Sequence, residues 1–400
     1  MTPANLPTVM HILDGYLPVT ENWLYRQMIG ITRYRVVAVP GRLYEARSFP
    51  LDNLCVCPRL FAAPRSWAGR AANRVAESAF CVQSRRQARV AKRFQASLLH
   101  AHFGQTGYNS LAAKRFAGLP LITSFYGRDA CLLPGVHPIW RRRYTRLFAE
   151  GDLFLAEGNH MKSTLVSLGC PQEKVVVHHL GVDLNALPFA IRRPDDDGTI
   201  RILAVGRFTE KKGLSYAVRA FARVARERVG VRLVLVGDGR GKAELAEKAE
   251  LLRLVHENSL GDRVRFTGYV GYPEFLSLIG ETHICIAPSV TAGDGDAEGG
   301  APVCLIEMSA SGMPVIATRH CDIGEVVLDG VSGFLAPERD VDSLSERLLH
   351  LVDHPQIWPA MGASGRRHIE KNYDAARQAV CLERTYDSLL GRAGPDESPC

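Results

Sequence analysis

The sequence lacks the features that mark membrane-spanning, secreted and zinc-binding proteins. No stretch of it approaches the roughly 18 consecutive apolar residues that a membrane-spanning helix needs. Residues 1–10 have neither the basic segment nor the long apolar core of a signal peptide. The 10 cysteines include no Cys-x-x-Cys pair, which argues against a zinc site and against a disulfide framework. We therefore expect a protein of the reducing cytoplasm.

A chain of 400 residues is too long for one compact core and suits two domains. Apolar runs alternate with helical patterns twice, which predicts two parallel sheets covered by helices on both faces. We expect strands at 9–13, 34–40, 98–103, 119–125, 153–156, 199–205, 231–236, 264–266, 284–287 and 315–317. Helices are expected at 21–29, 58–93, 109–116, 139–149, 214–228, 243–257, 273–280 and 302–311. The predicted parts are an N-terminal domain, a linker, a C-terminal domain, a C-terminal helix and a tail, at residues 1–183, 184–198, 199–372, 373–392 and 393–400.

Positive charge is concentrated in the first part of the chain. Residues 1–150 hold 21 Lys and Arg against 7 Asp and Glu, whereas the other 250 residues hold 28 against 35. Many of the cations lie in two clusters, at 85–93 and at 141–143. Such clusters bind nucleic acid, anionic lipid head groups or phosphorylated substrates, or they form a solvated helix face. No nucleic-acid motif accompanies them, so a peripheral contact with an anionic membrane is the partner that we predict.

The stretch 294–318 has the pattern of a site for a phosphate-bearing ligand. Glu298 and Glu307 bracket two glycines, Pro302 and an apolar run. Pro302 suits the first position of a helix, because its missing N–H would be unpaired there, and the glycines leave backbone amides open to a ligand. The start of a helix favours an anion, and Glu307 is able to accept hydrogen bonds from a diol. The alternative is a polar loop before an ordinary helix.

A basic loop follows the first strand of the second predicted domain. Gly206 and Arg207 end that strand, and Lys212 precedes the next helix, so cations and flexible backbone converge on one point. Arginine and lysine there suit a diphosphate, although a basic loop after a strand is often only solvated. A second glycine cluster, at 237–241, lacks the last glycine of the dinucleotide-binding fingerprint, so it predicts a tight turn between strand and helix.

Two histidines and an acidic turn follow strands of the first predicted domain. His100 and His102 share one face of a strand, but no third ligand with metal-binding spacing is visible, so we expect an acid–base or hydrogen-bonding role for His102 or a structural one. Tyr126 and Asp129 lie where the strand 119–125 ends. Asp129 is suited to accept a substrate hydroxyl, to pair with a neighbouring arginine or to cap a helix.

Together, these residues resemble the retaining glycosyltransferases of family 4 over nearly the whole chain. The motifs are Gly-Val-Asp at 181–183, Val-Gly-Arg at 205–207 with Lys-Gly at 212–213, Leu-Val-Gly-Asp-Gly at 235–239, Phe-Thr-Gly-Tyr at 266–269, Glu-Gly-Gly at 298–300 with Glu-Met-Ser-Ala-Ser-Gly-Met-Pro-Val at 307–315, and Gly-Val-Ser-Gly-Phe-Leu at 330–335. The resemblance implies the GT-B fold, in which two Rossmann-like β/α domains face each other across a cleft. It implies that the C-terminal domain binds the sugar-nucleotide donor, that the N-terminal domain binds the acceptor, and that the segment 373–392 returns to the N-terminal domain.

The resemblance also implies roles for single residues. Glu307 would bind the ribose hydroxyls and Glu298 would face the donor sugar, while Arg207 and Lys212 would neutralise the diphosphate leaving group. The implied catalytic set is Glu298, Arg207, Lys212 and His102. The implied donor-binding set is Gly15, Gly206, Arg207, Lys212, Glu298, Gly299, Gly300, Ala301, Pro302, Val303 and Glu307. Tyr126 and Asp129 are acceptor-side candidates, and no metal is expected if the two cations suffice.

Two features differ from the usual family pattern. The chain has eight residues between the two glutamates, at 299–306, where the family usually has seven. It has Tyr126 where the family often has a histidine, for which His102 is the nearest replacement.

The resulting prediction is a retaining glycosyltransferase that moves a sugar from a nucleotide-diphosphate donor to a lipid-linked or polysaccharide acceptor. A non-catalytic sugar-nucleotide-binding protein and a sugar-nucleotide epimerase remain as alternatives. A dehydrogenase is the least favoured, because the incomplete glycine cluster at 237–241 is its only support.

Overall fold

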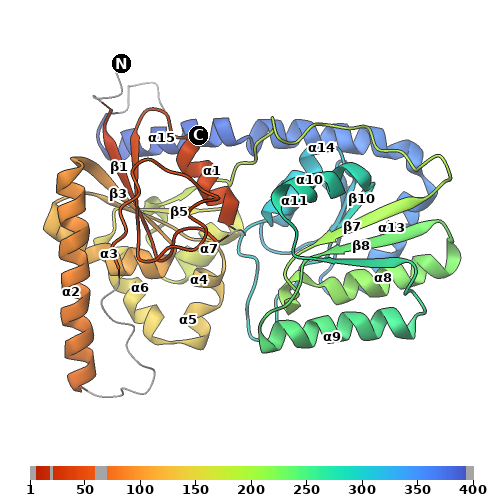
Figure 1. The fold of residues 1–400 in the computed structure, drawn as a ribbon, viewed down its shortest axis with the longest axis horizontal. Coiled ribbons are helices and arrows are strands. Elements are labelled where there is room, and N and C mark those ends of the chain that lie inside the picture. The colour runs from red at the N-terminus through yellow and green to blue at the C-terminus, as the bar shows by residue number, and fades with distance from the viewer. Residues whose placement is uncertain (1–5, 19–20, 59–69, 393–400) are drawn as a thin grey trace. The chain divides into compact units, whose positions relative to one another are not determined.

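The computed structural model describes residues 6–18, 21–58 and 70–392. They form two compact units, one of the residues up to Gly181 together with those from Ala375 on, and one of Val182–Asp374. Figure 1 shows that each unit is a parallel sheet with helices packed on it. The predicted tail at 393–400, and the part of the predicted helix at 58–93 that precedes Arg70, lie outside the described residues. No helix in the described ranges is long and apolar enough to cross a bilayer.

The first unit has a six-stranded parallel sheet in the order β2-β1-β3-β4-β5-β6. Its strands are β1 Thr8–Leu13, β2 Arg35–Pro40, β3 Ala96–His102, β4 Leu121–Ser124, β5 Leu153–Ala156 and β6 Val175–Val177. Its helices are α1 Asn22–Gly30, α2 Arg70–Arg93, α3 Gly104–Ala117, α4 Arg128–Cys131, α5 Leu133–Val136, α6 Ile139–Glu150, α7 Asn159–Ser167, the 3-10 helix Gln172–Lys174 and, from the end of the chain, α15 Ala375–Leu389.

The second unit has a six-stranded parallel sheet in the order β12-β11-β10-β7-β8-β9. Its strands are β7 Ile200–Val205, β8 Val231–Val236, β9 Val264–Gly268, β10 Ile284–Ala287, β11 Val315–Thr318 and β12 Gly333–Ala336. Its helices are α8 Leu214–Glu227, α9 Lys242–Glu257, α10 Tyr272–Glu281, α11 Val303–Ala310, α12 Ile323–Val326, α13 Val341–Asp353, α14 Trp358–Asn372 and the 3-10 helices Glu210–Lys212 and Pro355–Ile357.

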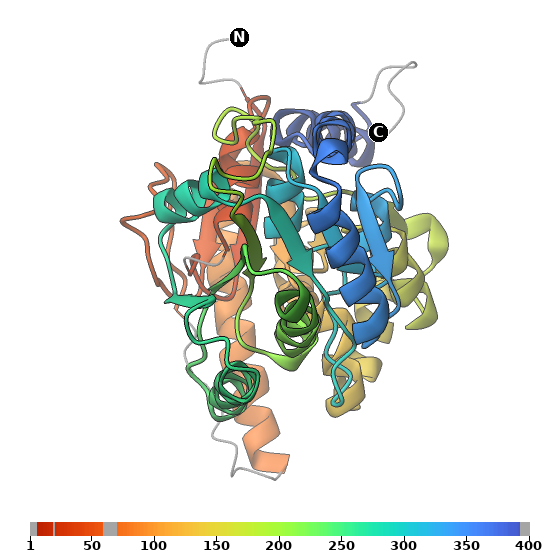
Figure 2. The same ribbon diagram turned by 90° about the vertical axis from the view of Figure 1, so that its right-hand side faces the viewer.

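Successive side chains of a strand point to opposite faces of its sheet, so apolar strands need helices to cover both faces. In β7, Ile202 and Ala204 belong to the apolar core beneath α8 and α13, whereas Leu203 belongs to the core beneath α10 and α11. A strand that is buried on both faces reads as a continuous apolar run, which is why these strands are visible in the sequence. Figure 2 looks onto the second unit and shows its sheet between the two helix layers.

The predicted linker at 184–198 is packed as part of the second unit. Arg192 is buried, and its guanidinium donates to the carbonyl oxygens of Ile279, Thr282 and Ser311 at 2.9, 3.1 and 3.0 Å. Burial lowers the pKa of Arg192 to about 10, so it still carries its charge at neutral pH. Proline, arginine and aspartate suggest an exposed linker in the sequence, but this arginine makes the segment an integral part of the domain.

Helix α3 begins five residues earlier than the sequence indicates. The expected loop at Gly104 is the first residue of the helix, because the carboxylate of Asp129 accepts a hydrogen bond from the Gly104 amide at 2.7 Å. A side chain at Gly104 would collide with Phe125, since a Cβ there would lie 2.3 Å from its ring. The capping group comes from a residue that is 25 positions later in the chain, so no local pattern predicts it.

Helix α15 belongs to the first unit, as the resemblance implied for the segment 373–392. Glu383 accepts hydrogen bonds from the backbone amides of Thr32 and Arg33 at 2.5 and 2.7 Å, and Asp387 accepts one from the Tyr34 hydroxyl at 2.7 Å. Figure 1 shows the helix lying along the sheet of that unit. Among the described cysteines seven are free thiols, and Cys381 on this helix is disulfide-bonded.

Candidate active site

The topology of the second sheet points to its carboxyl edge between β7 and β10. Counted from β7, the strands lie in the order 3-2-1-4-5-6, so the direction of building reverses between these two strands. Open parallel sheets bind ligands outside the carboxyl ends of their strands at such a reversal. The loop after β7 contains Lys212 and the loop after β10 contains Glu298, so the two residues predicted from the sequence lie at the position that the topology favours.

Lys212 and Glu298 form a buried ion pair. The Lys212 ammonium lies 2.9 Å from Oε1 and 3.0 Å from Oε2 of Glu298, and the Ser289 hydroxyl donates to Oε1 at 2.8 Å. The two side chains are 18% and 7% exposed. The extra residue between the two glutamates therefore leaves the carboxylate of Glu298 turned toward the basic loop.

Each member of this pair keeps the other charged. Burial acts to raise the pKa of Glu298, but the charges of Lys212 and Lys211 outweigh it and leave that pKa below its ordinary value. Burial acts to lower the pKa of Lys212, but Glu298 outweighs it and leaves that pKa raised. A fixed cation next to a carboxylate, both largely out of water, interacts strongly with charge that develops on a bound substrate.

Two glycines make room for this pair. A Cβ at Gly206 would lie 2.9 Å from Cγ of Lys212, so only glycine lets the lysine stem pass. Gly213 has φ +61°, and a Cβ there would lie 1.8 Å from the carbonyl oxygen of Pro288. Arg207, the other predicted cation, forms its ion pair with Glu244 on α9 and not with Glu298. Its side chain is half exposed and lies 3.6 Å from the Glu244 carboxylate.

The helix α11 presents Glu307 at the same edge. Pro302 is the residue that precedes the helix, which begins at Val303, and Gly299 before it has φ +83°. Glu307 is 8% exposed, and it accepts a hydrogen bond from the Tyr272 hydroxyl at 3.0 Å. The glycine loop at 299–302 and the carboxylate of Glu307 thus bracket the start of one helix, as the sequence predicts.

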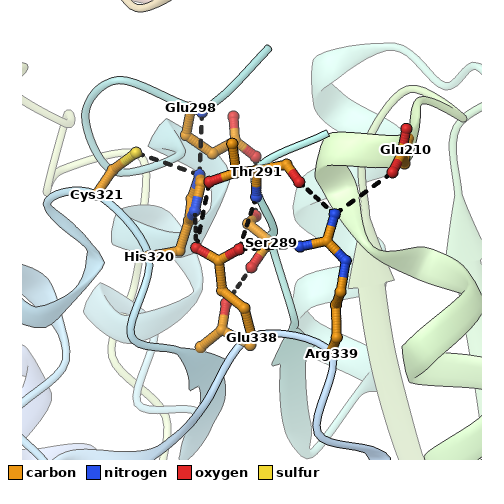
Figure 3. Close-up of polar contacts among 9 residues, drawn as sticks. Glu210, Ser289, Thr291, Glu298, His320, Cys321, Glu338 and Arg339 are labelled. Carbon is orange, nitrogen blue, oxygen red and sulfur yellow. Dashed lines mark hydrogen bonds and ion pairs between the residues drawn. The ribbon is translucent and has the colours of Figure 1, made fainter. Parts of the chain in front are cut away.

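Two contacts of Glu298 involve residues that the sequence did not single out (Figure 3). The Ser289 hydroxyl bonds its carboxylate. Nearby, Lys211 is a second buried cation, 3.2 Å from Asp296. The backbone N–H of Glu298 donates to Nε2 of His320 at 3.2 Å. His320 follows β11 and Ser289 follows β10, so the rule that sites gather at strand ends was the available signal for both.

In the first unit, His102 belongs to a cluster of three buried histidines. His11 of β1 supplies the third member, which the sequence analysis did not find, because it lies 91 residues away and meets His102 only through strand pairing. His11 Nδ1 lies 2.8 Å from His102 Nε2, and His102 Nδ1 lies 2.6 Å from the Tyr126 hydroxyl. Burial lowers the pKa of His11 to about 3 and that of His102 well below its ordinary value, so both are neutral at pH 7.

This cluster has the ligand types of a metal site but is already hydrogen-bonded. The ring nitrogens of His11, His100 and His102 come within 4.8 Å of one another. His100 bonds Tyr386 and Ser124, both at 2.7 Å, and within the cluster Nε2 of His11 is the ring nitrogen without a partner. A metal ion would have to displace these hydrogen bonds. We therefore keep the expectation that the protein needs no metal.

The acceptor-side candidates are engaged by the fold of the first unit. Both carboxylate oxygens of Asp129 accept backbone amides, from Gly104 at 2.7 Å and from Tyr126 at 3.0 Å. Burial raises the pKa of Asp129 to about 6, against these amides, which act to lower it. Burial also raises the pKa of the Tyr126 hydroxyl, which excludes it as a base at neutral pH. Gly15 follows β1 and packs beneath Tyr44, whose ring would lie 2.4 Å from an added Cβ.

Comparisons with known proteins identify the family of this chain. Residues 199–354 match the family described as glycosyl transferases group 1, and residues 34–186 match glycosyltransferase family 4. WcaL of Escherichia coli, assigned to colanic acid biosynthesis as a glycosyltransferase, is 32% identical over 78% of this chain and 73% of its own length. AmsK of Erwinia amylovora, an amylovoran biosynthesis glycosyltransferase, is 33% identical over 73% of this chain and 71% of its own length.

The fold also matches solved structures. HepE of Anabaena, solved in complex with UDP and glucose, superposes with a TM-score of 0.76 at 17% identity, covering 95% of this chain and 100% of HepE. At that identity the likeness establishes the fold, which is the GT-B fold of two Rossmann-like α/β domains. With relatives above 30% identity along most of their length, the chain belongs to glycosyltransferase family 4 and is a sugar-transferring enzyme of glycan synthesis.

Proposed function

We propose that the protein moves a sugar, with retention of anomeric configuration, from a nucleoside-diphosphate sugar to a hydroxyl of a glycan or lipid-linked glycan. The observation that supports this most is the buried Lys212–Glu298 pair at the topological reversal of the second sheet. A cation held there is placed to neutralise a diphosphate as it leaves, and it needs no reorganisation when the charge develops. The crystallised complex of HepE with UDP and glucose supports a donor of this kind.

The other donor contacts follow from the same edge. Glu307 takes the ribose hydroxyls, and the amides of the segment 299–303 contact the sugar and the phosphates at the start of α11. Arg207, half exposed and only 3.6 Å from Glu244, is able to swing onto the diphosphate beside Lys212. These two cations take the place that a metal ion has in other phosphate-binding sites. Retention rests on membership in the family.

In the first unit, Tyr126 and Asp129 are the acceptor-side candidates, His102 is the catalytic candidate and Gly15 is a candidate donor contact. The lowered pKa of His102 makes its ring a weak base, and the raised pKa of Tyr126 keeps its hydroxyl protonated, so their role is to orient a hydroxyl by hydrogen bonds rather than to remove its proton. Asp129 acts indirectly, because its carboxylate oxygens accept the backbone amides of Gly104 and Tyr126 and so fix the position of Tyr126.

A panel of nucleotide sugars tests the proposed function. A donor that binds only the folded state raises the free energy of unfolding by about 2.7 kcal/mol at 100 times its Kd, so its melting temperature rises with concentration. We expect one nucleotide sugar to stabilise the protein and to release its nucleoside diphosphate faster when an acceptor glycan is added. Conversion of the donor to another nucleotide sugar without acceptor would instead indicate an epimerase, and binding without turnover would indicate a sugar-nucleotide-binding protein.

We further propose that the exposed cations of α2 and α6 in the first unit bind the anionic inner surface of a cytoplasmic membrane, where a lipid-linked acceptor would lie. Helix α6 exposes Arg141 and Arg142 beside Ile139, whose side chain is 53% exposed, and α2 exposes Arg85, Arg89, Lys92 and Arg93. Each cation near an anionic surface contributes about 1 kcal/mol to binding.

We expect vesicles that contain anionic lipid to sediment the protein at low salt, and uncharged vesicles to leave it in solution. Reversal of two charges, by Arg141→Glu with Arg142→Glu, should weaken vesicle binding by more than about 10-fold. The matched control, Arg223→Glu with Arg226→Glu on α8, makes the same change in net charge on exposed residues of the other unit. Equal losses in both double variants, or no sedimentation of the wild type, would contradict the membrane proposal.

A further inference from the structure

The loop between β10 and α11, residues 288–302, is held at two points by one carboxylate, that of Glu338 (Figure 3). Oε2 of Glu338, which follows β12, accepts the backbone amide of Thr291 at 2.8 Å. Oε1 of Glu338 lies 2.7 Å from Nδ1 of His320, and Nε2 of that ring accepts the amide of Glu298 at 3.2 Å. Glu338 therefore fixes Thr291 directly and Glu298 through His320.

The tautomer of His320 follows from these contacts. The amide of Glu298 is a donor, so Nε2 must offer a lone pair, and the neutral ring then carries its proton on Nδ1, where it donates to Glu338. The side chain of His320 is 1% exposed, so water does not compete for either contact. The sulfur of Cys321 lies 3.2 Å from the same Nε2.

Other contacts hold the same loop in one conformation. Arg339 donates to the carbonyl oxygen of Thr291, and Glu210 accepts the amide of Gly293 at 3.0 Å. Lys211 donates to the carbonyl oxygen of Ala297 at 3.0 Å, one residue before Glu298. The members of this network follow four adjacent strands, β7, β10, β11 and β12, so the rigid sheet sets their separation.

We propose that His320 and Glu338 are positioning residues that set where the carboxylate of Glu298 lies against Lys212 and the donor sugar. The inference rests on the proposed function, and it assigns a task to two side chains that would themselves contact no substrate. A reacting centre displaced by about 1 Å loses on the order of 100-fold in rate, although binding elsewhere is intact. Glu307, the proposed ribose contact, lies on α11 and accepts from Tyr272, so its position is set outside the hydrogen bonds of this network.

The test is a split between kcat and nucleotide binding in full-length variants. His320→Ala removes both contacts, and we expect kcat with the identified donor to fall about 10- to 100-fold while the Kd for the nucleoside diphosphate changes less than about threefold. His320→Gln keeps an acceptor at the place of Nε2, so it should recover most of the lost kcat. Glu338→Ala, at a side chain that is 26% exposed, should lower kcat in the same direction without preventing folding.

The matched control is Glu370→Ala, which removes an exposed carboxylate with an equally short 2.7 Å ion pair on α14 and should leave kcat unchanged. The inference is overturned if the His320 and Glu338 variants keep wild-type kcat, if kcat and nucleotide affinity fall by the same factor, or if His320→Gln is as slow as His320→Ala. A wild-type protein that turns over no nucleotide sugar would instead overturn the proposed function, so the two failures are distinct.

Discussion

Replacing Lys212 by glutamine is expected to lower kcat for sugar transfer by about 100- to 1,000-fold, the loss typical of removing one fixed group that stabilises developing charge. The reason is that Lys212 is a buried cation at the reversal of the second sheet and lies 2.9 Å from Glu298. Steady-state kinetics with the identified donor measure the effect. A loss of less than about 10-fold would mean that the diphosphate leaves without help from this cation.

The same variant should also be less stable, because it leaves the carboxylate of Glu298 buried without its cation. Breaking a buried pair on one side costs about 3–5 kcal/mol. The double variant Lys212→Gln with Glu298→Gln removes both charges, so it should regain most of the stability but none of the activity. This comparison separates the chemical role of the lysine from its part in folding.

The contribution of Glu298 to stability should change with pH in opposite directions in the wild type and in Lys212→Gln. In the wild type the pKa of Glu298 is lowered by folding, so the pair stabilises the protein above the ordinary carboxylate pKa, and that stability is lost as pH falls through the lowered pKa. In Lys212→Gln, the charge of Lys211 and the hydrogen bond from Ser289 remain, but we expect burial, the largest cause, to dominate and to raise the pKa of Glu298 on folding. Its contribution should then be most favourable at low pH and be lost as pH rises through the raised pKa.

Replacing Glu307 by glutamine should raise the Kd for the nucleoside diphosphate by about 10- to 100-fold, because hydrogen bonds to a charged group contribute about 1.5–3 kcal/mol. Calorimetry measures this directly. The sharper test compares the nucleoside diphosphate with its 2′,3′-dideoxy analogue. We expect the wild type to discriminate strongly between them and Glu307→Gln to lose that discrimination, since both changes delete the same contact.

The companion variant Tyr272→Phe removes the hydroxyl that donates to Glu307 at 3.0 Å but keeps the carboxylate. It should weaken binding less than Glu307→Gln and preserve the preference for the ribose. Equal discrimination by wild type and Glu307→Gln would assign the ribose hydroxyls to another group.

Much of the fold was predictable because buried parallel strands are apolar throughout and their ends are marked by glycine and charge. The bounds of β5, β8 and β10 agree with the sequence prediction, as does the start of α8. The approach of Lys212 to Glu298 was predictable in kind, because both follow neighbouring strands of one sheet.

What escaped prediction depends on contacts between distant residues. His11 meets His102 across two paired strands, and Asp129 on α4 accepts the first amide of α3. Arg192 turns a polar, proline-containing segment into part of a core, against the usual meaning of its composition. The hydrogen bonds that join the Glu298 loop to Glu338 and His320 likewise require three strand ends to lie side by side, which happens only in the folded sheet.

The most direct test of the central claim is to incubate the wild-type protein with its stabilising nucleotide sugar and an acceptor glycan, and to identify the product by mass and by the anomeric configuration of the new linkage. We predict an acceptor that is heavier by one sugar residue, joined with the configuration of the donor, together with one equivalent of nucleoside diphosphate. An unchanged acceptor beside an epimerised or intact donor, or a linkage of inverted configuration, would contradict this account.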